Sequence, residues 1–232
     1  MRILITSGGT KVAIDPVRHI GNKSTGRFGA ALAEQALCAN NEVIYLTSED
    51  GKSPFFLQID GLNQDADMTK AKNFYEFTQV HRKNYHEYRY QYFSDYAENL
   101  EKLILKFKPD VVMLAAAVSD YLVKDYSNEK IRSNTELTIA LEKAPKIINH
   151  IKRWSPDVFL VGFKLLIDAS DDELVSAARK TMDQSQADLV IANNLSSIEK
   201  GAHEVLLVEK NGEYTRVKQQ LAEQVMKRIL QR

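Results

Sequence analysis

The stretch that organises this chain is Asn22-Lys23-Ser24-Thr25-Gly26-Arg27-Phe28-Gly29, close to the amino terminus. Before it, the apolar run 1–6 predicts a short buried strand, which ends in the turn-forming residues 7–10 (SGGT). After it, apolar residues recur at helical spacing, and we expect Ser24 or Thr25 to cap the helix. A strand, a glycine turn and a helix start together present backbone N–H groups that bind phosphate. The alternative is an ordinary chain reversal without a ligand.

Composition is that of an ordinary globular protein, with 232 residues, of which 44% are hydrophobic and 27% charged. The length suits a single domain, residues 1–232, better than two. Lys+Arg and Asp+Glu both number 31, so net charge does not indicate nucleic acid or a membrane surface as a partner. No apolar run reaches the roughly 20 residues of a membrane span, and no signal-peptide pattern is present. The single cysteine, Cys38, excludes an intrachain disulfide and favours the cytoplasm.

Strand and helix patterns alternate along the chain. After the first strand, further strands are predicted at 42–47, 111–118, 158–163 and 187–193, with helices over 95–105 and 145–154 and from 171 onward. This alternation predicts an α/β fold with a doubly wound, mostly parallel, Rossmann-like sheet. The last two strands, 204–208 and 214–217, flank Asn211-Gly212, which predicts an antiparallel hairpin at one edge. We expect residues 48–72 to be irregular, 137–141 to form a half-exposed strand, and 221–230 to form the closing helix.

Ligands in such sheets bind beyond the carboxyl ends of the strands. Four predicted strand ends bear informative residues, which are 8–10, 116–120, 163–164 and 193–194. Asp120 could bind a hydroxyl group or a metal ion, or could simply start a turn. Phe163 could stack on a base, or could fill the core. Lys130 and Arg132 lie in a polar segment whose default interpretation is a solvated loop.

The chain resembles the phosphopantothenoylcysteine synthetase (phosphopantothenate–cysteine ligase) family. The matching stretches appear in the family's order and cover nearly the whole chain; they are 5–10 (ITSGGT), 14–18 (IDPVR), 22–26 (NKSTG), 115–121 (AAAVSDY), 130–131 (KI), 145–147 (PKI), 162–164 (GFK) and 187–193 (ADLVIAN). Any one of these stretches is weak, whereas the ordered set is specific.

The resemblance implies amide ligation in two steps. The carboxylate of 4′-phosphopantothenate attacks the α-phosphate of CTP or ATP and releases pyrophosphate. The amine of cysteine then displaces the nucleoside monophosphate from the acyl-nucleotide. The resemblance also implies Mg²⁺ with the triphosphate and a homodimer with the site near the subunit boundary.

The same matching implies roles for individual residues. Asn22 would donate to the acyl carbonyl, and Lys130, on a mobile loop, would neutralise charge at phosphorus. The triphosphate would be held by Gly8, Ser24, Gly26 and Gly29. Ala116 and Ala117 would contact substrate, and the remaining nucleotide contacts would be Asp120, Pro145, Lys146, Ile147, Ile148, Phe163 and Lys180. No protein metal ligand is assigned.

Some positions depart from the pattern of many bacterial members. Val12 stands where they carry glutamate, and Thr181 and Ser185 stand where they carry lysines, with Lys180 one step away. These features resemble the stand-alone and eukaryotic-type members, and they leave the choice between CTP and ATP open. Because the chain begins at the ligase motif, we expect no decarboxylase half and no flavin.

Two other functions compete with the ligase. Tyr126 and Lys130 have the Tyr-x-x-x-Lys spacing of short-chain dehydrogenases, but Ser127-Asn128 favours a turn over the required helix. No Gly-x-Gly-x-x-Gly follows the first strand. The aromatic tract 74–96 could instead stack RNA bases in a non-enzymatic module.

The aromatic tract has a second interpretation as packing. Four of its tyrosines, Tyr85, Tyr88, Tyr92 and Tyr96, fall close to one helical face. We therefore favour a helix that packs on a neighbour, at the dimer boundary, over RNA binding.

Overall fold

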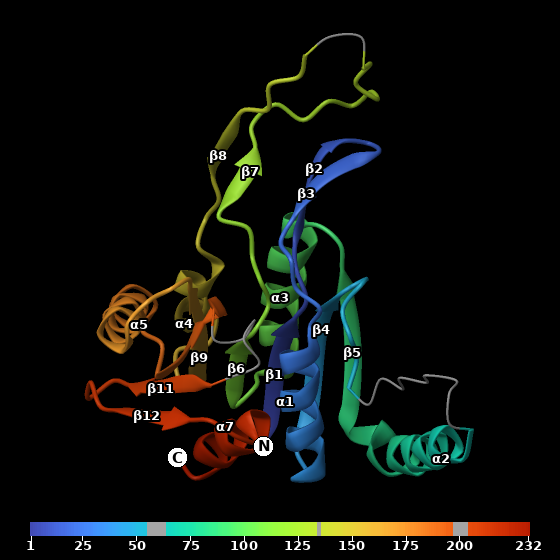
Figure 1. Ribbon diagram of the computed structural model, residues 1–232, viewed down its shortest axis with the longest axis vertical. Helices are drawn as coiled ribbons and strands as arrows, with labels where there is room; N and C mark the ends of the chain where they lie inside the picture. The colour runs from blue at the N-terminus through green and yellow to red at the C-terminus, as the bar shows by residue number, and fades with distance from the viewer. Residues whose placement is uncertain (55–63, 134–135, 197–203) are drawn as a thin grey trace.

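The structure is a computed structural model that describes residues 1–54, 64–133, 136–196 and 204–232, with backbone only for 64–67. Its centre is an eight-stranded sheet in the order β12-β11-β10-β9-β6-β1-β4-β5 (Figure 1). The strands are β1 (Arg2–Ser7), β4 (Glu42–Ser48), β5 (Tyr85–Tyr90), β6 (Val111–Leu114), β9 (Phe159–Leu166), β10 (Leu189–Asn194), β11 (Val205–Glu209) and β12 (Tyr214–Val217). The six neighbouring strands β10, β9, β6, β1, β4 and β5 pair in parallel, whereas β11 pairs antiparallel with both β10 and β12. The predicted doubly wound sheet with an edge hairpin is confirmed.

Helices cover both faces of the sheet. α1 (Arg27–Cys38) and α7 (Leu221–Leu230) bury Leu32 and Ile229 on one face, and α2 (Gln64–His81) adds Phe77 to the same cluster. α3 (Phe93–Phe107), α4 (Ile151–Trp154) and α5 (Asp171–Ser185) bury Leu100 and Met182 on the other. The central strands β1, β4 and β6, which separate these clusters, are almost wholly buried, as expected for a parallel sheet covered on both sides.

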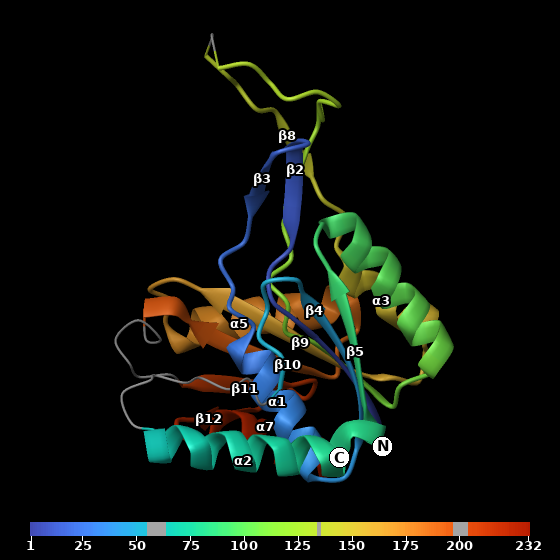
Figure 2. The same ribbon diagram turned by 90° about the vertical axis from the view of Figure 1, so that its right-hand side faces the viewer.

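Two small antiparallel hairpins rise from the carboxyl-end edge of the sheet (Figures 1 and 2). The first pairs β2 (Lys11–Asp15) with β3 (Arg18–Gly21), and the second pairs β7 (Tyr121–Val123) with β8 (Leu141–Lys143). We call the first the hairpin, and the second, with the described residues between its strands, the arm. The two touch, because the N–H of Ser127 in the arm donates to the carbonyl of Ile14 at 3.1 Å. The sequence patterns did not predict the hairpin.

The aromatic tract differs from its predicted form. Residues 85–90 form the edge strand β5, so the expectation that Tyr85, Tyr88, Tyr92 and Tyr96 share one helical face is wrong. Aromatic residues favour strands, and the alternation of period two sends Tyr88 and Tyr90 to one side and Tyr85 to the other. Pairing with β4, which is distant in sequence, therefore selects the strand, with its period of two, over the helical periodicity that the tyrosine spacing also fits.

The boundaries of several other helices and strands also differ from the predicted ones. Gly26, and not Ser24 or Thr25, is the N-cap of α1. The strand predicted at 137–141 is β8, at 141–143, and the helix predicted at 145–154 is the 3₁₀ turn η2 (Ile147–His150) followed by α4. Part of the stretch expected to be irregular is helical, since α2 begins at Gln64, while residues 55–63 lie outside the described part. The remaining 3₁₀ turn is η1 (Arg82–Asn84). No described helix is long and apolar enough to cross a membrane.

Candidate active site

Three glycines meet where β1 ends and α1 begins, and we call Gly8, Gly26 and Gly29 the glycine cradle. Gly8 and Gly26 have φ values of +80° and +72°, a region that favours glycine. The hydroxyl of Ser7 donates to the carbonyl of Gly26 at 3.0 Å. A Cβ on Gly29 would lie only 2.4 Å from that same hydroxyl oxygen. The glycines therefore allow the start of α1 to approach the turn after β1 closely.

The helix end at this turn is suited to an anion. Within the described residues no side chain caps α1 at Gly26, and the first helical turn carries no acidic residue. The Oγ of Ser24 accepts from the N–H of Gly26 at 3.4 Å, and Ser24 itself is exposed. The positive end of the helix dipole thus faces the cradle.

The predicted substrate residues lie beside the cradle. The N–H of Ala117 donates to the carbonyl of Gly8 at 2.8 Å, and the N–H of Asn22 donates to the carbonyl of Thr10 at 3.2 Å. The N–H of Ala116 donates to the Thr6 hydroxyl at 3.3 Å. The structure therefore brings Gly8, Asn22, Ala116 and Ala117 together at the carboxyl ends of β1 and β6.

Phe163 reaches the cradle from β9. Its ring meets the ring of Phe28, in the first turn of α1, edge-on with centroids 6.0 Å apart. The predicted partners of Phe163 in nucleotide binding, Ile147 and Ile148, pack with the core of the opposite sheet face. Pro145 and Lys146 are exposed before η2, and Lys146 forms an ion pair with Asp120. These predicted nucleotide contacts thus lie on both sides of β9.

Lys130 lies in the arm, away from the cradle of its own chain. The next residue, Ile131, contacts Asp15 and Arg18 at the tip of the hairpin, whereas Asn22 follows the hairpin's base. Four residues of antiparallel strand separate tip from base, which is about 14 Å. One chain alone therefore keeps Lys130 and Asn22 apart.

Lys180 is exposed on α5, remote from the glycine turn. Its neighbour Arg179 donates to the carbonyl of Gly212, in the β11–β12 turn, at 2.7 Å. The hydroxyls of Thr181 and Ser185 donate to backbone carbonyls one turn earlier in the same helix. The two positions where relatives carry lysine are thus occupied here by short side chains bonded within α5.

The segment proposed for a dehydrogenase does not form the helix that such an enzyme needs. Around Tyr126, the Ser127 hydroxyl donates to the carbonyl of Glu129 at 2.7 Å, in a non-helical turn. The aromatic tract proposed for RNA is divided between α2, η1, β5 and α3. Neither alternative gains support from this geometry.

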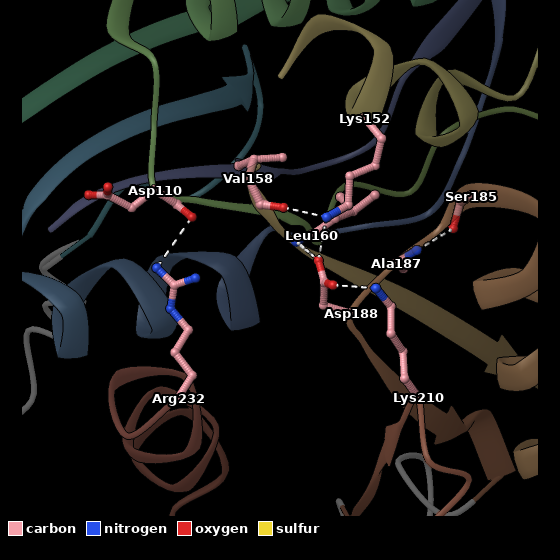
Figure 3. Close-up of polar contacts among 9 residues, drawn as sticks. All are labelled: Asp110, Lys152, Val158, Leu160, Ser185, Ala187, Asp188, Lys210 and Arg232. Atoms are coloured by element: carbon pink, nitrogen blue, oxygen red, sulfur yellow. Dashed lines mark hydrogen bonds and ion pairs between the residues drawn. The ribbon is translucent and has the colours of Figure 1, made fainter. Parts of the chain in front are cut away.

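A separate polar cluster surrounds Asp188, at the start of β10 and thus at the amino ends of the parallel strands (Figure 3). Its carboxylate accepts from Lys152 at 2.7 Å, from Lys210 at 2.5 Å and from the N–H of Leu160 at 2.8 Å. Burial raises the pKa of Asp188, but the two lysines and the Leu160 N–H outweigh it and lower the pKa overall. This cluster ties α4, β9, β10 and the β11–β12 turn together.

Sequence reasoning missed two groups that support the site. Asp15 and Arg18 hold the segment that carries Lys130, and their only signal was the stretch 14–18 matched to the family. The hydroxyls of the buried tyrosines Tyr45 and Tyr90 donate hydrogen bonds to the backbone around the cradle. Nothing in the sequence pattern around these tyrosines predicted these bonds.

Comparisons with known proteins agree on one family. The family model described as "DNA/pantothenate metabolism flavoprotein C-terminal domain" matches residues 1–80 and 93–232. The coenzyme A biosynthesis bifunctional protein CoaBC of Thermococcus kodakarensis is 36% identical over 210 residues, covering 90% of this chain and 45% of that protein. The phosphopantothenate–cysteine ligase of Mus musculus is 30% identical over 243 residues, covering 91% of this chain and 76% of that protein.

A solved structure matches over almost its whole length. The DNA/pantothenate metabolism flavoprotein from Streptococcus pneumoniae has 31% identity and a TM-score of 0.79, covering 99% of this chain and 98% of that chain. The chain spans about half the length of the bifunctional relatives.

Proposed function

This chain belongs to the family of the DNA/pantothenate metabolism flavoprotein C-terminal domain, and from this we propose that it is a phosphopantothenate–cysteine ligase of coenzyme A biosynthesis. The relative from mouse, which this chain matches over most of its length, bears that name. The observation that carries the proposal is the cradle of Gly8, Gly26 and Gly29, with Asn22, Ala116 and Ala117 beside it. It offers an anion site and an amide donor at one edge of the sheet.

The reaction needs charge neutralisation in both steps. When the phosphopantothenate carboxylate attacks the α-phosphorus, a P–O bond forms and pyrophosphate leaves, with Ser24 and the cradle holding the phosphates. When the cysteine amine attacks the acyl carbon, the nucleoside monophosphate leaves and the amine loses a proton. The side-chain amide of Asn22 donates to the carbonyl oxygen, where negative charge develops. Lys130 neutralises the phosphoryl group in the first step.

The nucleotide is CTP or ATP in this proposal. Phe163 lies against its base, while Asp120, Pro145, Lys146, Ile147 and Ile148 lie toward the base and ribose. The proposed site leaves out Lys180, because it is exposed on α5, remote from the glycine turn. Mg²⁺ usually binds through one or two protein carboxylates together with substrate phosphates. The described residues contain no group of three His, Cys, Asp or Glu side chains that could hold a metal ion, and the carboxylate of Asp120 is paired with Lys146, so Mg²⁺ would be held mainly by the triphosphate. When bound, Mg²⁺ would supply further charge neutralisation at the phosphates.

We further propose a homodimer. The arm and the hairpin expose large apolar side chains, with Val17 61% exposed, Tyr121 53% and Leu141 47%. Apolar side chains that project from the body suit burial against a second copy of the chain. Because Lys130 and Asn22 are apart in one chain, we propose that each site combines Lys130 of one chain with Asn22 of the other.

The proposed working unit is one ligase domain, residues 1–232, located in the cytoplasm. Strands from β1 near the amino terminus to β12 near the carboxyl terminus share one sheet, which supports a single unit. The exposed free thiol of Cys38 suits a reducing compartment.

The direct test incubates the protein with phosphopantothenate, cysteine and each of the four nucleoside triphosphates separately. Mass spectrometry should detect phosphopantothenoylcysteine and a nucleoside monophosphate with CTP or ATP. Omitting cysteine should leave the acyl-nucleotide bound to the protein. Absence of product with all four triphosphates would reject the proposed function.

A further inference from the structure

Asp15 is a buried carboxylate that the proposed mechanism does not use. It lies at the end of β2, and 1% of its surface is exposed. Its Oδ1 accepts from the N–H groups of Val17 and Arg18 at 2.9 and 2.8 Å, which closes the turn of the hairpin. A buried carboxylate whose first oxygen accepts two hydrogen bonds still needs a donor for its second oxygen.

That second oxygen reaches the arm. Oδ2 of Asp15 accepts from the N–H of Ile131 at 3.1 Å, and the guanidinium of Arg18 donates to the carbonyl of Ile131 at 2.7 Å. Asp15 and Arg18 also form an ion pair at 3.3 Å. Both backbone groups of Ile131 are therefore held by the hairpin, directly after Lys130.

A second contact holds the arm on the other side of Lys130. The N–H of Ser127 donates to the carbonyl of Ile14, the residue before Asp15, at 3.1 Å. Lys130 itself is exposed, so its ammonium remains accessible while the backbone on either side of it is fixed. A fixed backbone limits the positions that a long, flexible side chain can reach.

We infer that Asp15 is a positioning residue for the ligase reaction, whose carboxylate holds the Ile131 backbone so that Lys130 is presented to the phosphoryl group. The inference rests on the proposed function and on the proposed role of Lys130. Burial raises the pKa of Asp15, but its backbone N–H donors and Arg18 lower it overall, so the carboxylate is charged at neutral pH. A charged acceptor makes the stronger hydrogen bond to an N–H group.

The test replaces Asp15 in the full-length chain. Asp15→Asn keeps the shape and one oxygen for the hairpin turn, but it replaces the second acceptor by an NH₂ group. Pyrophosphate release in the first half-reaction should slow by on the order of 100-fold, the loss expected from a misplaced catalytic group, while nucleotide affinity stays within about twofold. Asp125→Asn, an exposed change in the same arm, is the matched control and should leave the rate unchanged.

A double-mutant cycle separates positioning from a general structural role. In the Lys130→Gln background, the residual pyrophosphate release, measured with enzyme in excess over long incubations, should fall no further with Asp15→Asn, because the group that Asp15 positions is already gone. The same fold loss in both backgrounds would overturn the inference. If Asp15→Asn does not fold, Asp15→Ser provides the second variant, since its hydroxyl can close the turn but is too short to reach Ile131.

Amide hydrogen exchange supplies a readout that does not depend on activity. The Ile131 amide should exchange at least about tenfold faster in Asp15→Asn than in the unmodified protein. Unchanged protection would refute the hydrogen bond that carries the inference. Failure of the ligase function itself would appear in the unmodified protein, so the two failures are distinguishable.

Discussion

The hydroxyl of Tyr90 donates a hydrogen bond of 2.6 Å to the backbone carbonyl of Ser7, the residue that precedes the glycine cradle. Tyr90 ends the edge strand β5, and only 2% of it is exposed. From β4, the Tyr45 hydroxyl donates to the carbonyl of Lys52 at 2.7 Å, and the N–H of Lys52 donates to Thr25 at 3.1 Å. Burial raises the pKa of Tyr45 to about 12, so this hydroxyl remains a donor at neutral pH. Two buried phenols thus support the backbone on either side of the cradle.

Tyr90→Phe removes only the hydroxyl and leaves the Ser7 carbonyl without that donor. The expected cost is about 1–2 kcal/mol of unfolding free energy. The KM for nucleotide should rise several-fold, because the turn after Ser7 is less fixed. Urea denaturation and steady-state kinetics measure both effects. Tyr88→Phe, on the same strand and sheet face, is the control; equal effects in the two variants would mean that the Ser7 contact is unimportant.

Gly29→Ala should disturb the cradle through steric overlap. The added methyl group would lie 2.4 Å from the Ser7 hydroxyl oxygen and 2.7 Å from its Cβ. We expect a loss of about 1–3 kcal/mol in stability and weaker nucleotide binding. Gly21→Ala is the matched change, because its methyl group would meet its nearest neighbour at 3.6 Å. Thermal unfolding and nucleotide titration should detect lower stability and weaker binding only in Gly29→Ala. A Gly29→Ala protein as stable as the unmodified protein would contradict the packing argument.

Lys130→Gln and Asn22→Asp should act on different half-reactions. Lys130→Gln should block acyl-nucleotide formation, whereas Asn22→Asp should slow amide formation by on the order of 100-fold, because a carboxylate repels the developing negative charge. Pyrophosphate release and amide formation are measured separately by rapid quench. Normal pyrophosphate release by Lys130→Gln would remove Lys130 from the mechanism, and equal loss in both halves would remove the Asn22 assignment.

Mixing these two inactive variants tests the shared site. If each site uses Lys130 of one chain and Asn22 of the other, a mixed dimer contains one intact site. Subunit exchange should then restore about a quarter of the unmodified activity, since about half of the dimers are mixed. A ligase assay after the two variants are refolded together measures the restored activity, and each variant refolded alone is the control. No recovery despite demonstrated mixed dimers would place both residues of a site in one chain.

Asp188→Asn should destabilise the amino-end edge of the sheet, because Lys152, which is 15% exposed, loses its charged partner. We expect a loss of about 2 kcal/mol at pH 7. The folded-state pKa of Asp188 lies below its usual value of 3.8, so its contribution is present above that value and is lost as pH falls through the folded pKa. Urea unfolding should show a smaller difference in unfolding free energy between Asp188→Asn and the unmodified protein at pH 3 than at pH 7. The control Asp157→Asn, at an exposed position, should have the same unfolding free energy as the unmodified protein at both pH values. If Asp188→Asn lost the same unfolding free energy at pH 7 and at pH 3, the link between the Asp188 pKa and stability would be contradicted.

The order of the main elements, from β1, α1 and β4 through β6, β9, α5 and β10 to the closing hairpin and α7, follows from the sequence because it depends on local patterns. Buried strands such as β1 and β10 are continuous apolar runs, and α1 and α7 place apolar residues on one face. Asn211-Gly212 specifies the turn of the β11–β12 hairpin because glycine adopts its φ of +84° without strain. The meeting of Gly8 and Ala117 was also predictable, since it follows from the carboxyl ends of parallel strands meeting at one edge.

Contacts between distant parts of the chain decided the rest. Residues 85–90 fit a helical face as well as a strand, and only pairing with β4 makes them an edge strand. The separation of Lys130 from Asn22 depends on two hairpins whose positions no local pattern specifies. Asp15 and Ile131 are 116 residues apart, so the bond between them exists only in the folded chain. The sequence by itself determined which groups could hold a phosphate, because that depends on backbone freedom and local periodicity; only the tertiary structure decided which groups meet.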